Sequence, residues 1–222
     1  ICLPDEEKPA VAVALIPFLR DQDLRVGKAG EGTEEIASQM VAGIKRRYEE
    51  TAEAASEAGL ACPLVATGHL TVVGSRTSDS ELDIHIGGLG AVKPSCFSGG
   101  FSYVALGHLH RPQAAGGDER VRYSGSPIAL SFSEAADCKE VRILDVKGEE
   151  IAQHSLPIPV YRRLAQIRTT TRELEGDLEV FDPAPGELPT WVEVIVEDAT
   201  IEDDLNERVR RLAENRSFEV LK

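Results

Sequence analysis

Three of the five histidines in the chain lie at or just after the ends of apolar stretches that are typical of buried strands. His69 ends the segment CPLVATGH (residues 62–69), and His108 and His110 follow the segment YVALG (residues 103–107). Side chains at the end of a strand are held by the sheet and still reach the surface. Because neutral imidazole is a common ligand of transition metals, neighbouring strands could bring these rings together around Mn, Fe or Zn.

The structural interpretation of these histidines has to be weighed beside the chemical one. An isolated H-x-H pair is more often structural than metal binding, and the second strand–Gly–His ending improves the odds only moderately. His85 and His154 lack this setting, so we interpret both as structural. The turn YSGSP (residues 123–127) is interpreted as a plain turn, and the chain has no segment with P-loop spacing that would predict nucleotide binding.

The elements before His69 are a short strand and a long helix. The apolar run AVAVALIPFL (residues 10–19) predicts a core strand. A helix is predicted from Thr33 to about residue 58, with Thr33 as its N-cap and Gly59 at its end. Its apolar stripe repeats every four residues: Ile36, Met40, Ile44 and Tyr48.

The rest of the chain predicts a hairpin and then a separate small domain. Residues 140–156 read as a β-hairpin that turns at Lys147–Gly148. After the linker PIPV (residues 157–160), strand and helix patterns alternate as β-α-β-α-β: residues 161–167, 171–181, 191–197, about 201–212 and 217–221. This order predicts an α+β domain with both helices on one face of the sheet.

Composition limits the functional classes. The net charge is −14, and both parts of the chain are acidic: residues 156–222 hold 15 acidic and 9 basic side chains. Simple electrostatic binding of DNA is therefore disfavoured. No apolar run approaches the ~18 residues that a membrane span needs. The four cysteines are dispersed, which favours reduced thiols in a cytoplasmic protein.

Four blocks of the sequence carry a family resemblance: ATGHLTVVG, TSDSELDIHIGGLGAV, YVALGHLHRPQ and VRYSGSPIALSFSEA. In this order and spacing they resemble the SbcD family of bacterial nuclease subunits, which belongs to the calcineurin-like metallophosphoesterases. The resemblance implies two divalent metal ions, usually Mn²⁺. It also implies that His69 and His108 bind one ion and that His110 binds the other. The partners implied are DNA, an SbcC-type coiled-coil ATPase and a second copy of the same protein.

The resemblance also implies a fold and a domain division. Residues 1–155 are expected to form the C-terminal half of a metallophosphoesterase β-sandwich flanked by helices, and residues 156–222 a small α+β capping domain. The family motifs D-x-H, G-D-x-x-D and G-N-H are absent from residues 1–60. We therefore expect that the N-terminal half of the phosphoesterase domain is missing, together with its catalytic residues. The 222 residues alone are then expected to be inactive and to bind metal weakly.

The function expected from the resemblance is that of a DNA nuclease in recombination and repair. Such an enzyme combines 3′→5′ exonuclease action on double strands with endonuclease action on single strands and hairpins. Two alternatives stay open. The first is a metallophosphoesterase for small phosphodiesters or phosphoproteins, because one metal centre serves many substrates. The second is a non-catalytic module that binds a partner ATPase.

Overall fold

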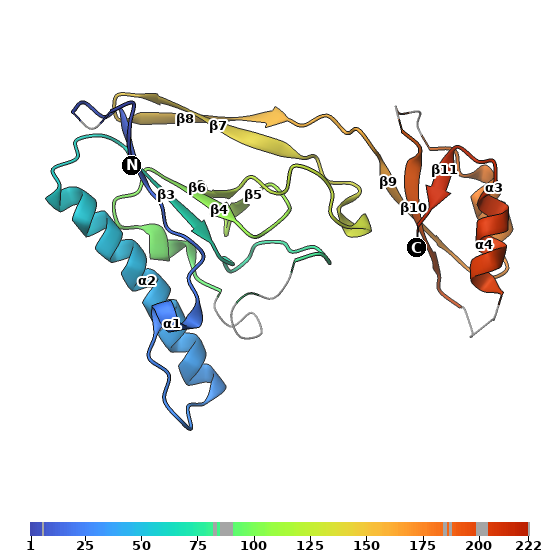
Figure 1. Cartoon of the computed structure of the whole chain (residues 1–222), viewed down its shortest axis with the longest axis horizontal. Coiled ribbons are helices and arrows are strands. Elements are labelled where there is room, and N and C mark those ends of the chain that lie inside the picture. The colour runs from blue at the N-terminus through green and yellow to red at the C-terminus, as the bar shows by residue number, and fades with distance from the viewer. Residues whose placement is uncertain are drawn as a thin grey trace. The chain divides into compact units, whose positions relative to one another are not determined.

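The computed structural model describes most of the 222 residues and divides them into two compact units. The first unit comprises residues 1–127 and 138–157, and the second comprises residues 128–137 and 158–222 (Figure 1). Each unit has its own hydrophobic core. His85 lies outside the described residues, which are all except 6, 82–83, 85–90, 184–185, 187, 199–203 and 222.

The first unit is built on a six-stranded sheet with the order β1-β2-β3-β4-β6-β5. Its four inner strands run parallel to one another, and the two edge strands are antiparallel to their neighbours. The strands are β1 (Cys2–Leu3), β2 (Val11–Ala14), β3 (Leu64–His69), β4 (Tyr103–Gly107), β5 (Gln113–Ala115) and β6 (Asp118–Tyr123). Because β3 and β4 are parallel neighbours, their carboxyl ends meet at the same edge of the sheet.

One long helix, α2 (Thr33–Glu57), packs on this sheet as its apolar stripe predicts. Met40, Ile44 and Tyr48 are fully buried, and the Tyr48 ring meets Phe97 edge-on at 4.8 Å between centroids. The N-cap is Gly32, and no side chain caps the helix, so the expected Thr33 cap is wrong. Thr33 is itself the first helical residue, since the backbone becomes extended one residue earlier than the sequence suggested.

Shorter elements connect the longer ones in both units. Helix α1 (Asp21–Leu24) packs on α2, where Gly43 leaves room for the Leu24 backbone. Two 3₁₀ turns, at Pro94–Phe97 in the first unit and Phe132–Glu134 in the second, connect longer elements.

The predicted hairpin is confirmed as β7 (Glu140–Lys147) and β8 (Glu150–Pro157), with Lys147 paired to Glu150 across the turn. Gly148 adopts a φ of 62°, a left-handed angle that favours glycine at this turn. The hairpin contacts the sheet of the first unit through Gln153, whose side-chain amide donates a 2.9 Å hydrogen bond to the Glu119 carbonyl.

The second unit confirms the predicted β-α-β-α-β order. Its elements are β9 (Leu164–Thr169), α3 (Leu174–Val180), β10 (Thr190–Val196), α4 (Leu205–Ala213) and β11 (Phe218–Val220). The three strands are parallel, in the order β11-β10-β9. Parallel crossovers of the same hand bring both helices to one face, and Figure 1 shows α3 and α4 side by side on the sheet.

Both units therefore mix helices with sheets, which agrees with the predicted α+β class. The assignment of residues 1–155 to half of a metallophosphoesterase sandwich stays a prediction, as does the capping role of residues 156–222. All four cysteines are free thiols. In the part of the chain that the structure describes, no helix combines the length and the apolar character that crossing a membrane requires.

Candidate metal centre

The carboxyl ends of β3 and β4 bring two of the predicted ligands together. His69 is paired with Gly107 in the parallel ladder, so His108 follows at the next position along the sheet edge. The rings of His69 and His108 lie 5.4 Å apart between centroids, with an interplanar angle of 58°. The register shows that the two strands are neighbours, as the expected convergence of His69 and His108 requires.

The glycine in each strand–Gly–His ending has a packing reason. A Cβ at Gly68 would overlap the hydroxyl of Tyr48, which donates a 3.0 Å hydrogen bond to the Thr67 carbonyl. A Cβ at Gly107 would lie 3.0 Å from Nδ1 of His69. A side chain at Gly68 would therefore displace the Tyr48 hydroxyl, and one at Gly107 would crowd the His69 ring.

His108 has an unusual backbone. Its φ is 101°, in the region that non-glycine residues rarely adopt. Holding a non-glycine residue at such an angle costs about 1–3 kcal/mol, and strained residues of this kind cluster at functional sites. Glycine would adopt this angle without the penalty, so His108 carries a strain that glycine at this position would avoid.

The segment after His69 is fixed by a buried tyrosine. The hydroxyl of Tyr123, on β6, donates a 2.8 Å hydrogen bond to the Leu70 carbonyl and accepts a 3.0 Å bond from the Val72 amide. The His69 ring itself meets Phe18 edge-on at 5.9 Å between centroids. These contacts hold the end of β3 in place.

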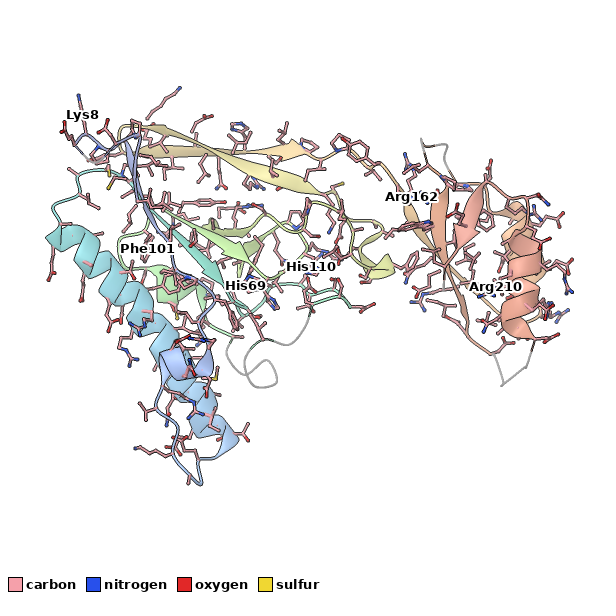
Figure 2. All side chains as sticks on the ribbon, in the orientation of Figure 1. Lys8, His69, Phe101, His110, Arg162 and Arg210 are labelled. Atoms are coloured by element: carbon pink, nitrogen blue, oxygen red, sulfur yellow. The ribbon has the colours of Figure 1, made fainter. Side chains whose placement is uncertain are left out.

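His110 lies two residues beyond His108 and is held by hydrogen bonds to both its backbone and its ring. Its Nδ1 lies 2.9 Å from the hydroxyl of Ser80, and its amide donates a 2.6 Å hydrogen bond to Glu81. Its carbonyl accepts bonds from the Ser126 amide at 3.0 Å and from the Lys139 ammonium at 2.9 Å. Figure 2 shows His69 and His110 at the same end of the sheet.

Sequence reasoning missed four of the described residues that hydrogen-bond to His110. Ser80 and Glu81 were considered only within the block TSDSELDIHIGGLGAV, and Ser126 only within the turn YSGSP and the block VRYSGSPIALSFSEA that contains it. Lys139 is 5% exposed, although lysine is rarely buried. Nothing in the local pattern signals these contacts, because each residue is separated from His110 by at least 16 positions and meets it only through the tertiary fold.

The remaining histidine that the structure describes stands apart from this edge. His154 lies on β8 with an exposed side chain, and its Nδ1 is 3.5 Å from Oδ2 of Asp145. Within the described residues, no three His, Cys, Asp or Glu side chains are arranged so that they could hold a metal ion. The described site is therefore a pair of rings with a third histidine close by in sequence.

Comparison with known proteins finds relatives that match nearly the whole chain. The family model SbcD_C, described as the type 5 capsule protein repressor C-terminal domain, matches residues 160–222. The SbcD subunit of nuclease SbcCD from Escherichia coli K12 is 34% identical over 216 residues, covering 96% of this chain and 54% of that protein.

Two further relatives carry the same name. The SbcD subunit of Rhodobacter capsulatus is 41% identical over 161 residues, covering 69% of this chain and 38% of that protein. The Bacillus subtilis protein is 48% identical over 88 residues, covering 39% and 22% respectively. The chain thus spans about half the length, or less, of these curated relatives. Over the region that it shares with them, the chain belongs to the family of SbcD subunits of the SbcCD nuclease.

Proposed function

We propose that this chain contributes to a metal-dependent DNA nuclease of the SbcD type. The activities proposed are 3′→5′ exonuclease action on double-stranded DNA and endonuclease action on single strands and hairpins, in recombination and repair. The observation that carries the proposal is the His69–His108 pair at the adjacent ends of β3 and β4. It occurs in a chain that is similar over 96% of its length to a nuclease subunit.

The donor set fits the expected metal chemistry. With metal–nitrogen distances of about 2.1 Å, two imidazole rings on one ion have centroids within roughly 6.5 Å of each other. The observed 5.4 Å between His69 and His108 satisfies this limit. In the proposal these two residues hold one divalent ion, and His110 holds the second. Two such ions, proposed to be Mn²⁺, would supply a hydroxide nucleophile and stabilise the leaving oxygen of a phosphodiester.

The residues of the chain hold and orient these groups. Parallel pairing fixes the backbone of His69, and the positive φ of His108 sets the direction in which its ring leaves the strand. All three ligands are neutral imidazoles when they bind, so they leave the charge of the ions uncompensated at the place where a phosphate would lie. This feature reconciles a chain of net charge −14 with a polyanionic substrate.

Three imidazoles are too few to fill the coordination of two ions. We therefore propose that the 222 residues alone bind metal weakly and lack activity. The partners proposed are DNA, a second copy of the same protein and an SbcC-type coiled-coil ATPase. Residues 156–222 are proposed to act as the capping domain that shapes access of DNA to the metals.

A chimera tests the proposed function. The 222 residues replace the matched segment of the Escherichia coli relative, and the product is assayed with Mn²⁺ on a DNA hairpin and on an aryl phosphodiester. We expect cleavage of the hairpin that His108→Ala abolishes and that the matched control His154→Ala retains. A folded chimera that cleaves only the aryl ester would favour the small-substrate alternative. A folded chimera without either activity would favour the non-catalytic one.

A further inference from the structure

Two buried charged side chains hydrogen-bond to the backbone of His110, one at its amide and one at its carbonyl. On one side its amide donates to Oε1 of Glu81, whose side chain is only 3% exposed. On the other side its carbonyl accepts from the ammonium of Lys139 and from the amide of Ser126. The ammonium of Lys139 also donates a 3.0 Å hydrogen bond to the hydroxyl of Ser126. The position from which the His110 ring projects is therefore fixed.

The turn that follows β6 contains a glycine that allows the Ser126 amide to reach the His110 carbonyl. Gly125 has a φ of 82°, and a Cβ there would lie 2.6 Å from the His110 carbonyl oxygen. Such a separation is far inside van der Waals contact. Glycine at this position lets the Ser126 amide approach His110, which gives the turn YSGSP (residues 123–127) a specific structural purpose.

The ring of His110 is held through Nδ1. The Ser80 hydroxyl lies 2.9 Å from this nitrogen, and the Ser78 hydroxyl lies 3.1 Å from that of Ser80. Oε1 of Glu81 is 3.9 Å from the same nitrogen. An ionised carboxylate only accepts hydrogen bonds, and its negative charge stabilises a proton on the nearer ring nitrogen. Ser80 can then accept from Nδ1–H and donate onward to Ser78.

We propose that Ser80 and Glu81 are positioning residues that hold neutral His110 as the Nδ1–H tautomer and leave the lone pair on Nε2. The use of this lone pair for a metal ion rests on the proposed function, whereas the tautomer does not. A hydrogen bond to the second ring nitrogen commonly fixes the tautomer and orientation of a metal-binding histidine. Neutral histidine in water favours the opposite tautomer, with the proton on Nε2, so the two outcomes are distinct.

Long-range ¹H–¹⁵N NMR of the metal-free 222-residue chain tests the proposal directly. The spectrum is recorded at a pH at which the ring is neutral, and His110→Gln identifies the His110 resonances by their loss. We expect Nδ1 to resonate as a protonated ring nitrogen and Nε2 as an unprotonated one. A His110 ring with its proton on Nε2 would overturn the proposal.

Variants then identify the groups responsible. Ser80→Ala and Glu81→Gln are each expected to move the His110 tautomer toward Nε2–H, whereas Ser80→Thr keeps the hydroxyl and should preserve Nδ1–H. Ser98→Ala, which removes an exposed hydroxyl elsewhere in the first unit, is the matched control and should change nothing. An unchanged tautomer in both folded Ser80→Ala and Glu81→Gln would contradict the assignment.

A second readout separates this proposal from the proposed function. Mn²⁺ affinity, measured by electron paramagnetic resonance, should fall roughly 10- to 100-fold in Ser80→Ala, the usual effect of losing an outer hydrogen bond to a ligand. Absence of Mn²⁺ binding in the wild-type chain and the chimera would count against the proposed function and leave the tautomer assignment standing. A wild-type His110 ring with its proton on Nε2, together with intact Mn²⁺ binding, would count against the tautomer assignment and leave the proposed function standing.

Discussion

The positive φ of His108 predicts that glycine at this position gives a more stable protein than alanine, which is the opposite of the usual order within regular structure. His108→Ala and His108→Gly both remove the imidazole, so they differ only in what the backbone tolerates. At a φ of 101° a non-glycine residue carries strain of about 1–3 kcal/mol, and alanine retains it. Glycine is free of that strain but costs about 0.4–1 kcal/mol more chain entropy on folding. The glycine variant should therefore be the more stable by roughly 1 kcal/mol.

The assay must report on the first unit. Three of the four tyrosines, at positions 48, 103 and 123, are buried there, so tyrosine difference absorbance during urea unfolding follows this unit. Trp191 is the one tryptophan and lies in the second unit, so its fluorescence gives an internal reference. Its transition should be the same in both variants.

A matched pair on another histidine controls for the identity of the substitutions. His154 lies on β8 without a positive φ, so His154→Ala should be more stable than His154→Gly by about 0.5–1 kcal/mol. The sign of the difference should thus be opposite at the two histidines. Equal or greater stability of His108→Ala relative to His108→Gly would refute the strain argument.

Three further predictions concern packing and protonation in the first unit. Gly68→Ala should destabilise the protein by about 1–3 kcal/mol because the added methyl group would overlap the Tyr48 hydroxyl. Adding Tyr48→Phe should restore much of the lost stability, and urea unfolding of the single and double mutants measures both effects. Burial raises the pKa of Tyr48 and of Tyr123 in the folded state, so their contribution to stability is complete below the ordinary tyrosine pKa of about 10 and is lost as the pH rises above it. Unfolding free energies that stay constant through this alkaline range would contradict that linkage. Burial also raises the pKa of the Cys96 thiol. An aromatic disulfide reagent should therefore label exposed Cys138 rapidly and buried Cys96 only on unfolding. Equal labelling rates of the two thiols in the native chain would show that Cys96 is accessible.

Local pattern predicted the elements of this protein well where periodicity and turn chemistry act alone. The stripe of α2, the Lys147–Gly148 hairpin and the β-α-β-α-β order of the second unit all follow from spacing that neighbouring residues impose. The N-terminus of α2 was misplaced by one residue because Gly32 and Thr33 are both acceptable caps, and only the backbone path decides between them.

The candidate site was predictable only in part. The strand–Gly–His endings could be read from the sequence, but the register that places Gly107 opposite His69 is set by tertiary packing. The reasons for Gly68 and Gly125 lie in Tyr48 and His110, which are distant in sequence. Contacts of this kind leave no local signature, so the residues that hold His110 had to be found in the fold.

The measurement that tests the central claim most directly is paramagnetic broadening of histidine ring resonances by Mn²⁺. Substoichiometric Mn²⁺ is added to the ¹⁵N-labelled chain, since weak binding is sufficient for this effect. We predict selective broadening of the His69, His108 and His110 rings, while His154 remains sharp. Broadening that is uniform across the four rings, or greatest at His154, would contradict a metal centre at the ends of β3 and β4.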